Sequence, residues 1–234
     1  MEGPHGKVKL KIALIGYGKM GKAVEASAIA RHHEIVDPQL ADCLIDFTAP
    51  QAVIDNMRKY APLKKNIVMG TTGWYDKLPE IESIVKEEKI GFLYSPNFSL
   101  GVNLFLKIVE EAAKYVQDHP EYDIGAMEMH HTEKKDSPSG TAKAIAQKLL
   151  KNLTRKKRVV YDKVDRVIHP DELHFSSLRV GHEPGTHSVF FDSTADRISL
   201  THQAKGREGF ALGAVIAAEW LQGKKGIFTM EDLF

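Results

Sequence analysis

The segment Gly16-Tyr17-Gly18-Lys19-Met20-Gly21 constrains the fold of this chain more than any other feature of its sequence. It matches the pattern G-x-G-x-x-G, directly after a predicted strand at residues 9–15 and before a predicted helix at residues 19–31. In that context the first glycine permits a tight turn, the second lets the backbone approach a pyrophosphate, and the third allows close helix packing. The start of the helix adds N–H groups and a dipole that favour phosphates. We therefore predict a dinucleotide-binding loop; a glycine-rich turn without a ligand is the alternative.

Short apolar runs alternate with amphipathic stretches over the first part of the chain. Strands are predicted at residues 9–15, 34–36, 43–47, 66–69 and 90–94, and helices at residues 19–31, 51–60 and 79–88. Strands that alternate with helices indicate crossover units and a parallel sheet covered on both faces. The prediction is an α/β fold with an N-terminal Rossmann-type domain over residues 1–98, whose ligands gather at the carboxyl ends of the strands.

The pattern changes after Pro96. Helices are predicted at residues 104–116 and 140–153, and strands at residues 124–129, 159–161, 178–180, 188–191 and 198–202. Two helices packed on a mostly antiparallel or mixed sheet predict a C-terminal α+β domain over residues 99–206. A last helix at residues 210–222 ends before Gly223, and we expect the segment 207–234 to return to the first domain.

Composition excludes several other classes of protein. The 234 residues carry a formal net charge of +1, which argues against a dedicated nucleic-acid binder. No apolar run approaches the ~20 residues that span a bilayer, and the run before Gly16 is too short for a signal-peptide core, so no membrane association is expected. The single cysteine, Cys43, cannot form an internal disulfide and fits a reduced, cytoplasmic setting. The basic run at residues 154–158 is expected to lie in an exposed loop or at a helix end.

Further cofactor contacts are expected where the other strands end. Asp37 follows the second strand and is suited to accept hydrogen bonds from the ribose of NAD and to repel a 2′-phosphate, whereas Lys19 would favour that phosphate. NADH and NADPH both stay open, with NADH favoured; a turn residue before Pro38 is the alternative for Asp37. Small and hydroxyl-bearing residues suited to a nicotinamide and its ribose follow the fourth and fifth strands: Gly70, Thr71, Thr72, Ser95, Pro96, Asn97 and Phe98.

The stretch E-M-H-H-T-E-K-K-D-S-P-S-G-T-A at residues 128–142 leaves a strand, crosses a polar loop and opens a helix. His130 can carry a proton near neutral pH, and Lys134 can donate one if it is partly desolvated. The N–H groups of Gly140 and Thr141 at the helix start can hold a carboxylate, to which His131 and Lys134 can add charge-assisted bonds. The segment therefore predicts an acid beside an anion site; a solvated polar loop is the alternative.

We expect no metal in this segment. Two adjacent histidines on an extended chain point to opposite sides. They also lack the helical His-x-x-x-His spacing of a zinc site, and no cysteine lies nearby.

The stretch at residues 128–142 resembles the signature E-x-H-H-x-x-K-x-D-x-P-S-G-T-A of the 4-hydroxy-tetrahydrodipicolinate reductases, also called dihydrodipicolinate reductases. Other stretches that carry the resemblance are G-Y-G-K-M-G, I-D-F-T, G-T-T-G, N-F-S-L-G-V-N, S-L-R-V-G and P-G-T-H. The resemblance implies NAD(P)H-dependent reduction of a small cyclic dicarboxylate, 4-hydroxy-tetrahydrodipicolinate, to tetrahydrodipicolinate with loss of water, in lysine biosynthesis through diaminopimelate. It also implies a homotetramer whose C-terminal domain binds the substrate and mediates assembly.

By position, the resemblance implies that His130 is a proton donor and acceptor and that Lys134 is a proton donor. It implies substrate binding by His131, Gly140 and Thr141. Pro38 stands where an arginine often follows the second-strand acid in this family, which weakens the case for NADPH. Two rival hypotheses are a Rossmann reductase for another amino-acid-derived acid and a nicotinamide-binding sensor without turnover.

Overall fold

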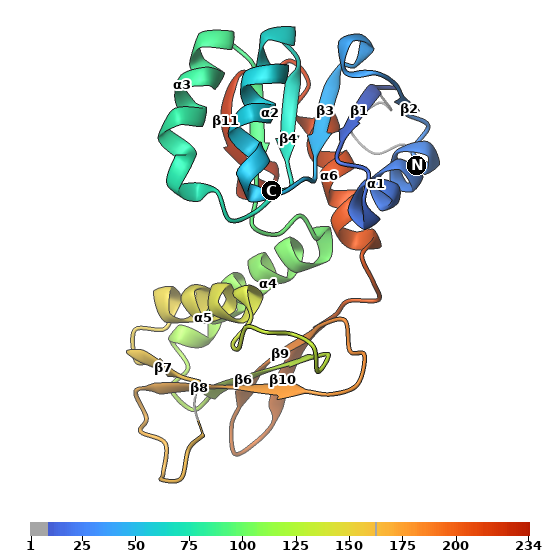
Figure 1. Ribbon diagram of the computed structural model, residues 1–234. Helices are drawn as coiled ribbons and strands as arrows, with labels where there is room; N and C mark the ends of the chain where they lie inside the picture. The colour runs from blue at the N-terminus through green and yellow to red at the C-terminus, as the bar shows by residue number, and fades with distance from the viewer. Residues whose placement is uncertain (1–8, 162) are drawn as a thin grey trace, which may run out of the picture. The chain divides into compact units, whose positions relative to one another are not determined.

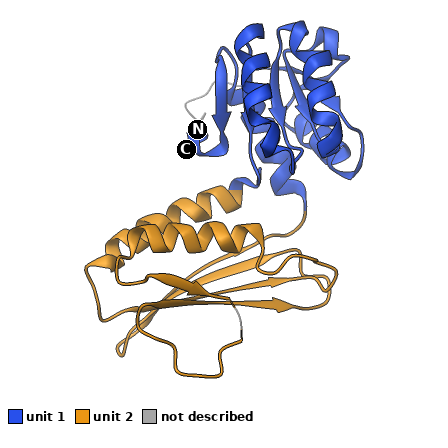
Figure 2. Ribbon diagram, turned by 60° about the vertical axis from the view of Figure 1, so that its left-hand side comes forward, with its two compact units in different colours: residues 1–100, 207–234 blue, residues 101–206 orange. Residues whose placement is uncertain are grey.

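A computed structural model describes residues 9–161 and 163–234, and the chain divides into two compact units (Figures 1 and 2). Unit 1 comprises Met1–Leu100 together with Arg207–Phe234, and unit 2 comprises Gly101–Gly206. Each unit has its own sheet and its own helices.

Unit 1 is built on a six-stranded sheet in the order β11-β5-β4-β3-β1-β2, and every pairing is parallel. The strands are β1 (Lys11–Ile15), β2 (Glu34–Ile35), β3 (Cys43–Asp46), β4 (Asn66–Met69), β5 (Gly91–Tyr94) and β11 (Gly226–Thr229). Helices cover both faces: α1 (Lys19–Ala30) and α6 (Glu208–Trp220) on one, α2 (Val53–Tyr60) and α3 (Leu78–Glu88) on the other. The predicted Rossmann-type parallel sheet is confirmed.

Strand β3 shows why this sheet lies between two cores. Its four residues are all buried. Because successive side chains on a strand point to opposite faces, Cys43 and Ile45 pack with the core under α1 and α6, whereas Leu44 packs with the core under α2 and α3. A strand buried on both faces has a continuous apolar run, which is the pattern that predicted it.

Strand β11 is the main difference from the prediction in unit 1, because no strand was predicted after the last helix. It pairs with β5 in parallel, with Ile227 opposite Phe92 and Phe228 opposite Leu93. The run G-I-F-T has only four residues and directly follows two lysines, so local periodicity does not distinguish it from a loop. Its strand conformation is decided by pairing with a segment far away in the sequence.

Unit 2 contains a five-stranded mixed sheet in the order β10-β9-β6-β8-β7. The central strand β6 is antiparallel to β9 and parallel to β8. The strands are β6 (Asp123–His130), β7 (Arg158–Val160), β8 (Glu172–Arg179), β9 (Thr186–Asp192) and β10 (Arg197–Gln203). Two helices, α4 (Leu100–Gln117) and α5 (Gly140–Asn152), lie along one face of the sheet (Figure 2), and the predicted α+β arrangement is confirmed.

Strand β8 is longer than predicted, because it begins at Glu172 rather than at residue 178. Leu173 and Phe175 enter the core, but the next two residues on the same face are Ser177 and Arg179. This change from apolar to polar on one face hides the alternation that identifies a half-buried strand. Helix α4 likewise begins at Leu100, four residues before the predicted start.

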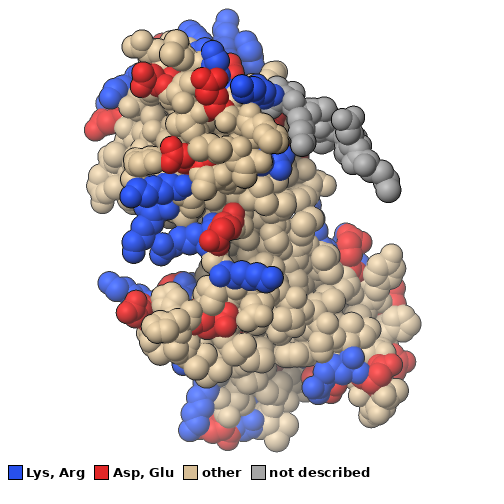
Figure 3. All heavy atoms as spheres, turned by 90° about the vertical axis from the view of Figure 1, so that its right-hand side faces the viewer, with Lys and Arg blue, Asp and Glu red and all other residues tan. Residues whose placement is uncertain are grey.

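Basic and acidic side chains are interspersed on each unit on the face drawn in Figure 3. In the part of the chain that the structure describes, no helix combines the length and the apolar character needed to cross a membrane.

Candidate active site

The inner face of the unit 2 sheet, under α4 and α5, changes from apolar to polar along its length. On β6, Ile124 and Ala126 belong to the apolar core. Glu128 and His130 follow on the same face and are also buried. The site is therefore a polar continuation of the core, at the carboxyl end of β6.

The neighbouring strands add polar side chains to the same end of the sheet. Ser177 of β8 and His187 of β9 lie opposite Glu128. Arg179 of β8 lies opposite His130. Strand pairing therefore brings together residues that are about fifty positions apart in the chain.

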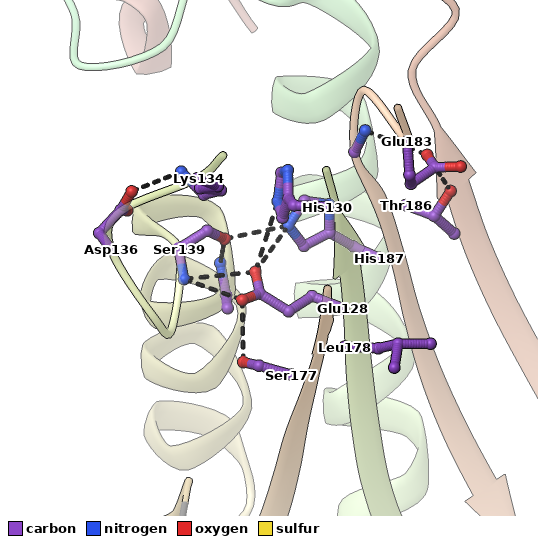
Figure 4. Close-up of polar contacts among 12 residues, drawn as sticks. Glu128, His130, Lys134, Asp136, Ser139, Ser177, Leu178, Glu183, Thr186 and His187 are labelled. Carbon is purple, nitrogen blue, oxygen red and sulfur yellow. Dashed lines mark hydrogen bonds and ion pairs between the residues drawn. The ribbon is translucent and has the colours of Figure 1, made fainter. Parts of the chain in front are cut away.

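Glu128 is 0% exposed, and its carboxylate is the centre of this network (Figure 4). Donors reach it from the loop before α5, from β8 and from β9. Oε1 accepts from the Ser139 N–H at 3.1 Å, the Ser177 hydroxyl at 2.9 Å and Arg179 Nη2 at 3.1 Å, and Nε2 of His187 and of His130 lie 3.4 and 3.5 Å from Oε2.

The environment of Glu128 keeps its carboxyl group ionised. Burial raises the pKa of this group, but hydrogen bonds from His187, Ser139 and Ser177 outweigh burial. The net effect holds the pKa of Glu128 well below its ordinary value. A charge is thus fixed at the end of the apolar core.

His130 is 9% exposed and stands beside this charge. Burial lowers the pKa of its imidazole, the Glu128 charge opposes that effect, and His187, Lys134 and Arg179 reinforce it. The rings of His130 and His187 meet edge to face with centroids 5.2 Å apart. The pKa of His130 is therefore set by several charged groups within one cluster.

Unpaired polar atoms concentrate at this end of the sheet. Among the described residues, four buried side-chain nitrogens have no hydrogen-bond partner: His130 Nε2, Arg179 Nε, His187 Nδ1 and His202 Nδ1. His202 lies opposite His187 in the β9–β10 pairing. Buried polar groups are usually paired, so a cluster of exceptions marks this region as a site that can accept a polar ligand.

The loop between β6 and α5 carries the other predicted residues of the segment. Lys134 is mostly buried, with its side chain 21% exposed, and its Nζ contacts Asp136 Oδ1 at 2.7 Å. Its N–H donates to the carbonyl of the half-buried His131 at 3.2 Å. The predicted cation is therefore held by the loop, close enough to His130 to lower the pKa of that imidazole.

Ser139 caps α5, because its hydroxyl accepts from the Ala142 N–H at 3.1 Å. The next residue, Gly140, is exposed, and a Cβ there would meet nothing within 4 Å. Thr141, in the same turn, is half-buried. The first turn of α5 thus presents an open surface and the positive end of the helix dipole, which suits a carboxylate.

Glu128, His130 and His187 also offer three potential metal-ligand atoms within 4.8 Å of one another. Arg179 already supplies a positive charge to the carboxylate, and His187 Nε2 already contacts the Ser139 hydroxyl at 3.1 Å. These contacts favour an ion-pair network over a metal centre at this cluster.

In unit 1 the glycine loop has the geometry that close packing demands. Gly16 has φ +87°, and a Cβ there would stand 2.3 Å from the carbonyl oxygen of Phe47. A Cβ at Gly21 would stand 2.3 Å from the Gly16 carbonyl oxygen, but one at Gly18 would meet nothing within 4 Å. Contacts within the chain therefore require glycine at residues 16 and 21 but not at residue 18. The free space beside Gly18 leaves room for a pyrophosphate.

The start of α1 is suited to an anion. Gly18 is its N-cap, no side chain caps the helix, and its first turn holds no acidic residue. Tyr17 and Lys19 are exposed, and Met20 packs partly against the core. Tyr17 donates through its hydroxyl to Glu25. The residues present fit a phosphate group.

Two predicted hydroxyl groups in unit 1 are used inside the protein. The Thr71 hydroxyl accepts from the Thr48 N–H at 2.7 Å and donates to Asp46 Oδ1 at 3.0 Å. The Ser95 hydroxyl is bound to the backbone of Asn97. Both side chains therefore hold the loops at the carboxyl edge of the sheet.

The other predicted cofactor residues differ in exposure. Thr72 and Pro96 are exposed, while Phe98 is buried and meets Phe47 edge to face. Gly70 is fixed by Phe47, because a Cβ there would stand 2.2 Å from the ring. Asp37 is exposed two residues after β2, and its carboxylate caps no backbone group of the short turn that follows. It is thus available to a ribose.

Sequence reasoning assigned no role to Glu128, Arg179, His187 or Asp46. Asp46 is buried at the end of β3 and accepts from Thr48, Thr71 and Asn56. The signal for all four was the same: a polar residue at an inward position of a strand whose other inward residues are largely apolar.

Comparisons with known proteins decide the family. The family model for the C-terminus of dihydrodipicolinate reductases matches residues 101–234. The chain belongs to the dihydrodipicolinate reductase family. The model for the N-terminus of these reductases matches residues 26–98, which begins after the glycine loop. As a member of this oxidoreductase family with a Rossmann-type domain, the protein uses a nicotinamide cofactor.

Relatives cover nearly the whole chain. A 4-hydroxy-tetrahydrodipicolinate reductase of Christiangramia forsetii is 40% identical over 96% of this chain and 97% of its own length. One of Archaeoglobus fulgidus is 41% identical over 94% of this chain and 82% of its own length. A dipicolinate-bound dihydrodipicolinate reductase from Paenisporosarcina sp. TG-14 has a TM-score of 0.78 at 21% identity, over 97% of this chain and 100% of that chain, and shares the fold.

Proposed function

We propose that this protein reduces 4-hydroxy-tetrahydrodipicolinate to tetrahydrodipicolinate with loss of water, as the names of its relatives indicate. The product belongs to the diaminopimelate route to lysine. One observation carries the proposal: a histidine, a lysine and an open helix start surround a single buried network in unit 2. That combination suits a substrate that is both an anion and a proton acceptor.

Substrate binding is assigned to the first turn of α5. The N–H groups of Gly140 and Thr141 and the positive end of the helix dipole would hold a carboxylate, with His131 as a further donor. A dipicolinate-bound relative of the same fold supports a small dicarboxylate as ligand. A fixed carboxylate orients the ring, so that one carbon alone is presented for reduction.

Proton transfer is assigned to Lys134 and His130. Hydride addition leaves negative charge on the ring, and a nearby cation lowers the energy of that state. The Lys134 side chain is only 21% exposed and can donate a proton, while burial lowers the pKa of His130, so that its neutral imidazole can accept one. Water leaves before this step: the ring hydroxyl group departs with a proton from the neighbouring ring carbon, which creates the double bond to which the hydride then adds.

The nicotinamide cofactor supplies the hydride, and unit 1 is assigned to hold it. The glycine loop, with the start of α1, would bind the pyrophosphate, and Asp37 would accept from the adenosine ribose. The segments Gly70–Thr72 and Ser95–Phe98 would contact the nicotinamide side, where Thr72 and Pro96 are exposed. We favour NADH, because the exposed Asp37 carboxylate repels a 2′-phosphate and no arginine follows it.

We also propose that the protein assembles as a homotetramer through unit 2. Among the described residues of unit 2, the helices lie on one face of the sheet. Its other face carries apolar side chains that are half-buried or exposed: Met127, Met129, Leu178 and Phe190. Contact with further copies would remove these side chains from water. Light scattering coupled to size exclusion would give the mass of a tetramer for the wild type and a smaller mass for Leu178→Lys.

Ligand binding tests the assignment of function. Pyridine-2,6-dicarboxylate, a planar mimic of the substrate, is expected to raise the melting temperature in the presence of NADH, because a ligand that binds only the folded state stabilises it by mass action. Benzoate, with one carboxylate, serves as the control and should raise it far less. Equal effects of the two compounds, or no effect of either, would contradict a dicarboxylate site.

A further inference from the structure

The buried carboxylate of Glu128 connects the separate parts of the site in unit 2. The first connection runs to α5. The N–H of Ser139 donates to both carboxylate oxygens, at 3.1 and 3.3 Å. Ser139 is also the N-cap of α5 and contacts His187 through its hydroxyl. Glu128 therefore fixes the residue from which the open first turn of the helix begins.

The second connection runs through Arg179 to the loop that carries Lys134. Arg179 Nη2 donates to Glu128 Oε1 at 3.1 Å and to the carbonyl of Asp136 at 2.9 Å. The Asp136 carboxylate in turn binds Lys134 Nζ. One guanidinium thus joins a buried strand to the loop, and Lys134 is the end of that chain of contacts.

The energetic cost of burying the ion pair of Glu128 and Arg179 indicates that the pair does more than stabilise the fold. Burying an ion pair costs desolvation that its attraction only partly offsets, so apolar side chains of similar size would stabilise the fold equally well. Glu128 stands directly after two apolar residues on its face of β6, and such a replacement would extend the core. The charge is therefore better explained by what it holds in place.

We propose that Glu128 and Arg179 are the positioning residues of this site, fixing the Lys134 loop and the first turn of α5 in the arrangement that binds and protonates the substrate. Neither needs to touch the substrate for this role. The inference rests on the proposed reductase function and adds two residues to it.

Unit 2 offers a matched control. Glu172, at the other end of β8, is 1% exposed and also lies in a network of arginines. Arg166 binds both of its carboxylate oxygens, and Arg158 contacts one of them. This network holds no residue assigned to the reaction. Loss of the Glu172 charge should thus affect stability without affecting the site.

The experiment compares Glu128→Gln and Arg179→Lys with Glu172→Gln in steady-state kinetics of the full chain. Both site variants should lower kcat by about 10- to 100-fold and raise KM for the dicarboxylate, because small misplacements of reacting groups are costly. Their KM for NADH should stay within about twofold of wild type, as unit 1 is unchanged. Glu172→Gln should lose stability yet keep all three constants.

The pH profile gives a readout that a purely structural role would not change. The charged and titratable groups that act on His130 are Glu128, His187, Lys134 and Arg179. Glu128 is the one that raises the pKa of His130, so its removal lowers that pKa further. The limb of the pH–rate profile that reports His130 should move to lower pH in Glu128→Gln and stay in place in Glu172→Gln.

Hydrogen exchange separates this inference from the proposed function. Backbone amides of residues 131–141 should exchange faster in Glu128→Gln and Arg179→Lys than in wild type or Glu172→Gln. The positioning role would be overturned if both site variants had the same kinetic constants and exchange rates as Glu172→Gln. A wild type without turnover would refute the reductase function, and the exchange comparison would still decide whether the pair fixes the loop. Arg179→Lys keeps the positive charge, so it tests the positioning role even if Glu128→Gln does not fold.

Discussion

Gly185 lies against the imidazole ring of His130. A Cβ at residue 185 would stand 2.8 Å from Cε1 and 3.3 Å from Nδ1 of that ring. The residue has φ +146°, and its carbonyl accepts from the Ala204 N–H at 2.8 Å, which ties it to the end of β10. The position of the His130 ring therefore depends on the absence of a side chain at residue 185.

Gly185→Ala should lower turnover by about tenfold or more, because the new methyl group displaces the imidazole. Gly181→Ala is the control. Gly181 also has a positive φ, of +47°, but a Cβ there would meet nothing within 4 Å. Both variants carry backbone strain, and only the first moves His130. Equal turnover in the two variants would remove His130 from the mechanism.

Lys134→Ala should reduce kcat by roughly 10²- to 10⁴-fold, the usual contribution of a positioned acid. NADH affinity should stay within a few-fold, since Lys134 lies in unit 2. Lys135→Ala, at the exposed neighbouring position, controls for the loss of one positive charge from the loop. Steady-state kinetics and NADH fluorescence titration give the two quantities. A Lys134→Ala protein with normal kcat contradicts the assignment.

The glycine loop allows binding to be separated from folding. Gly18→Ala should leave the melting temperature nearly unchanged, because a Cβ there meets no atom of the chain, yet it should weaken NADH binding by filling the space beside the helix start. Gly21→Ala should lower both, because its Cβ would clash with the Gly16 carbonyl. Thermal melting and NADH titration distinguish the two. Unchanged NADH affinity in Gly18→Ala would count against pyrophosphate binding at this loop.

Much of unit 1 could be predicted from the sequence because each buried strand and each amphipathic helix has its own local pattern. Strand β11 could not, since its four residues become a strand only by pairing with β5. The exposed setting expected for the basic run at residues 154–158 was wrong for one member. Lys156 is 3% exposed, because its Nζ binds Asp123 and two backbone carbonyls.

The candidate site likewise has one part that could be predicted from the sequence and one part that could not. His130, Lys134 and the start of α5 lie in one contiguous segment whose residue types could be interpreted directly. Arg179 and His187 reach the site only through the register of β8 and β9 with β6, and sequence alone does not fix register. The network around Glu128 therefore could not be predicted from the sequence, because it depends on long-range strand pairing. Arg179 and His187 nevertheless both stand at inward positions of their strands.

Acid should weaken the contribution of Glu128 to stability. Its pKa is lowered in the folded protein, so the charge contributes fully to stability above the unfolded value of about 4.3, and the contribution declines as pH falls from there towards the lower folded pKa. The difference in unfolding free energy between wild type and Glu128→Gln should therefore be largest near neutral pH and shrink below about pH 4. Urea unfolding between pH 7 and pH 3 measures this difference, and one that does not vary with pH would contradict a depressed pKa.

The most direct test of the reductase function is turnover by the purified protein. Substrate is made in the cuvette from pyruvate, aspartate semialdehyde and the synthase that condenses them, and the absorbance of the reduced nicotinamide is followed with NADH and, separately, NADPH. The account predicts a loss of absorbance that requires every component and is faster with NADH. A folded protein that binds NADH but oxidises neither cofactor would contradict it.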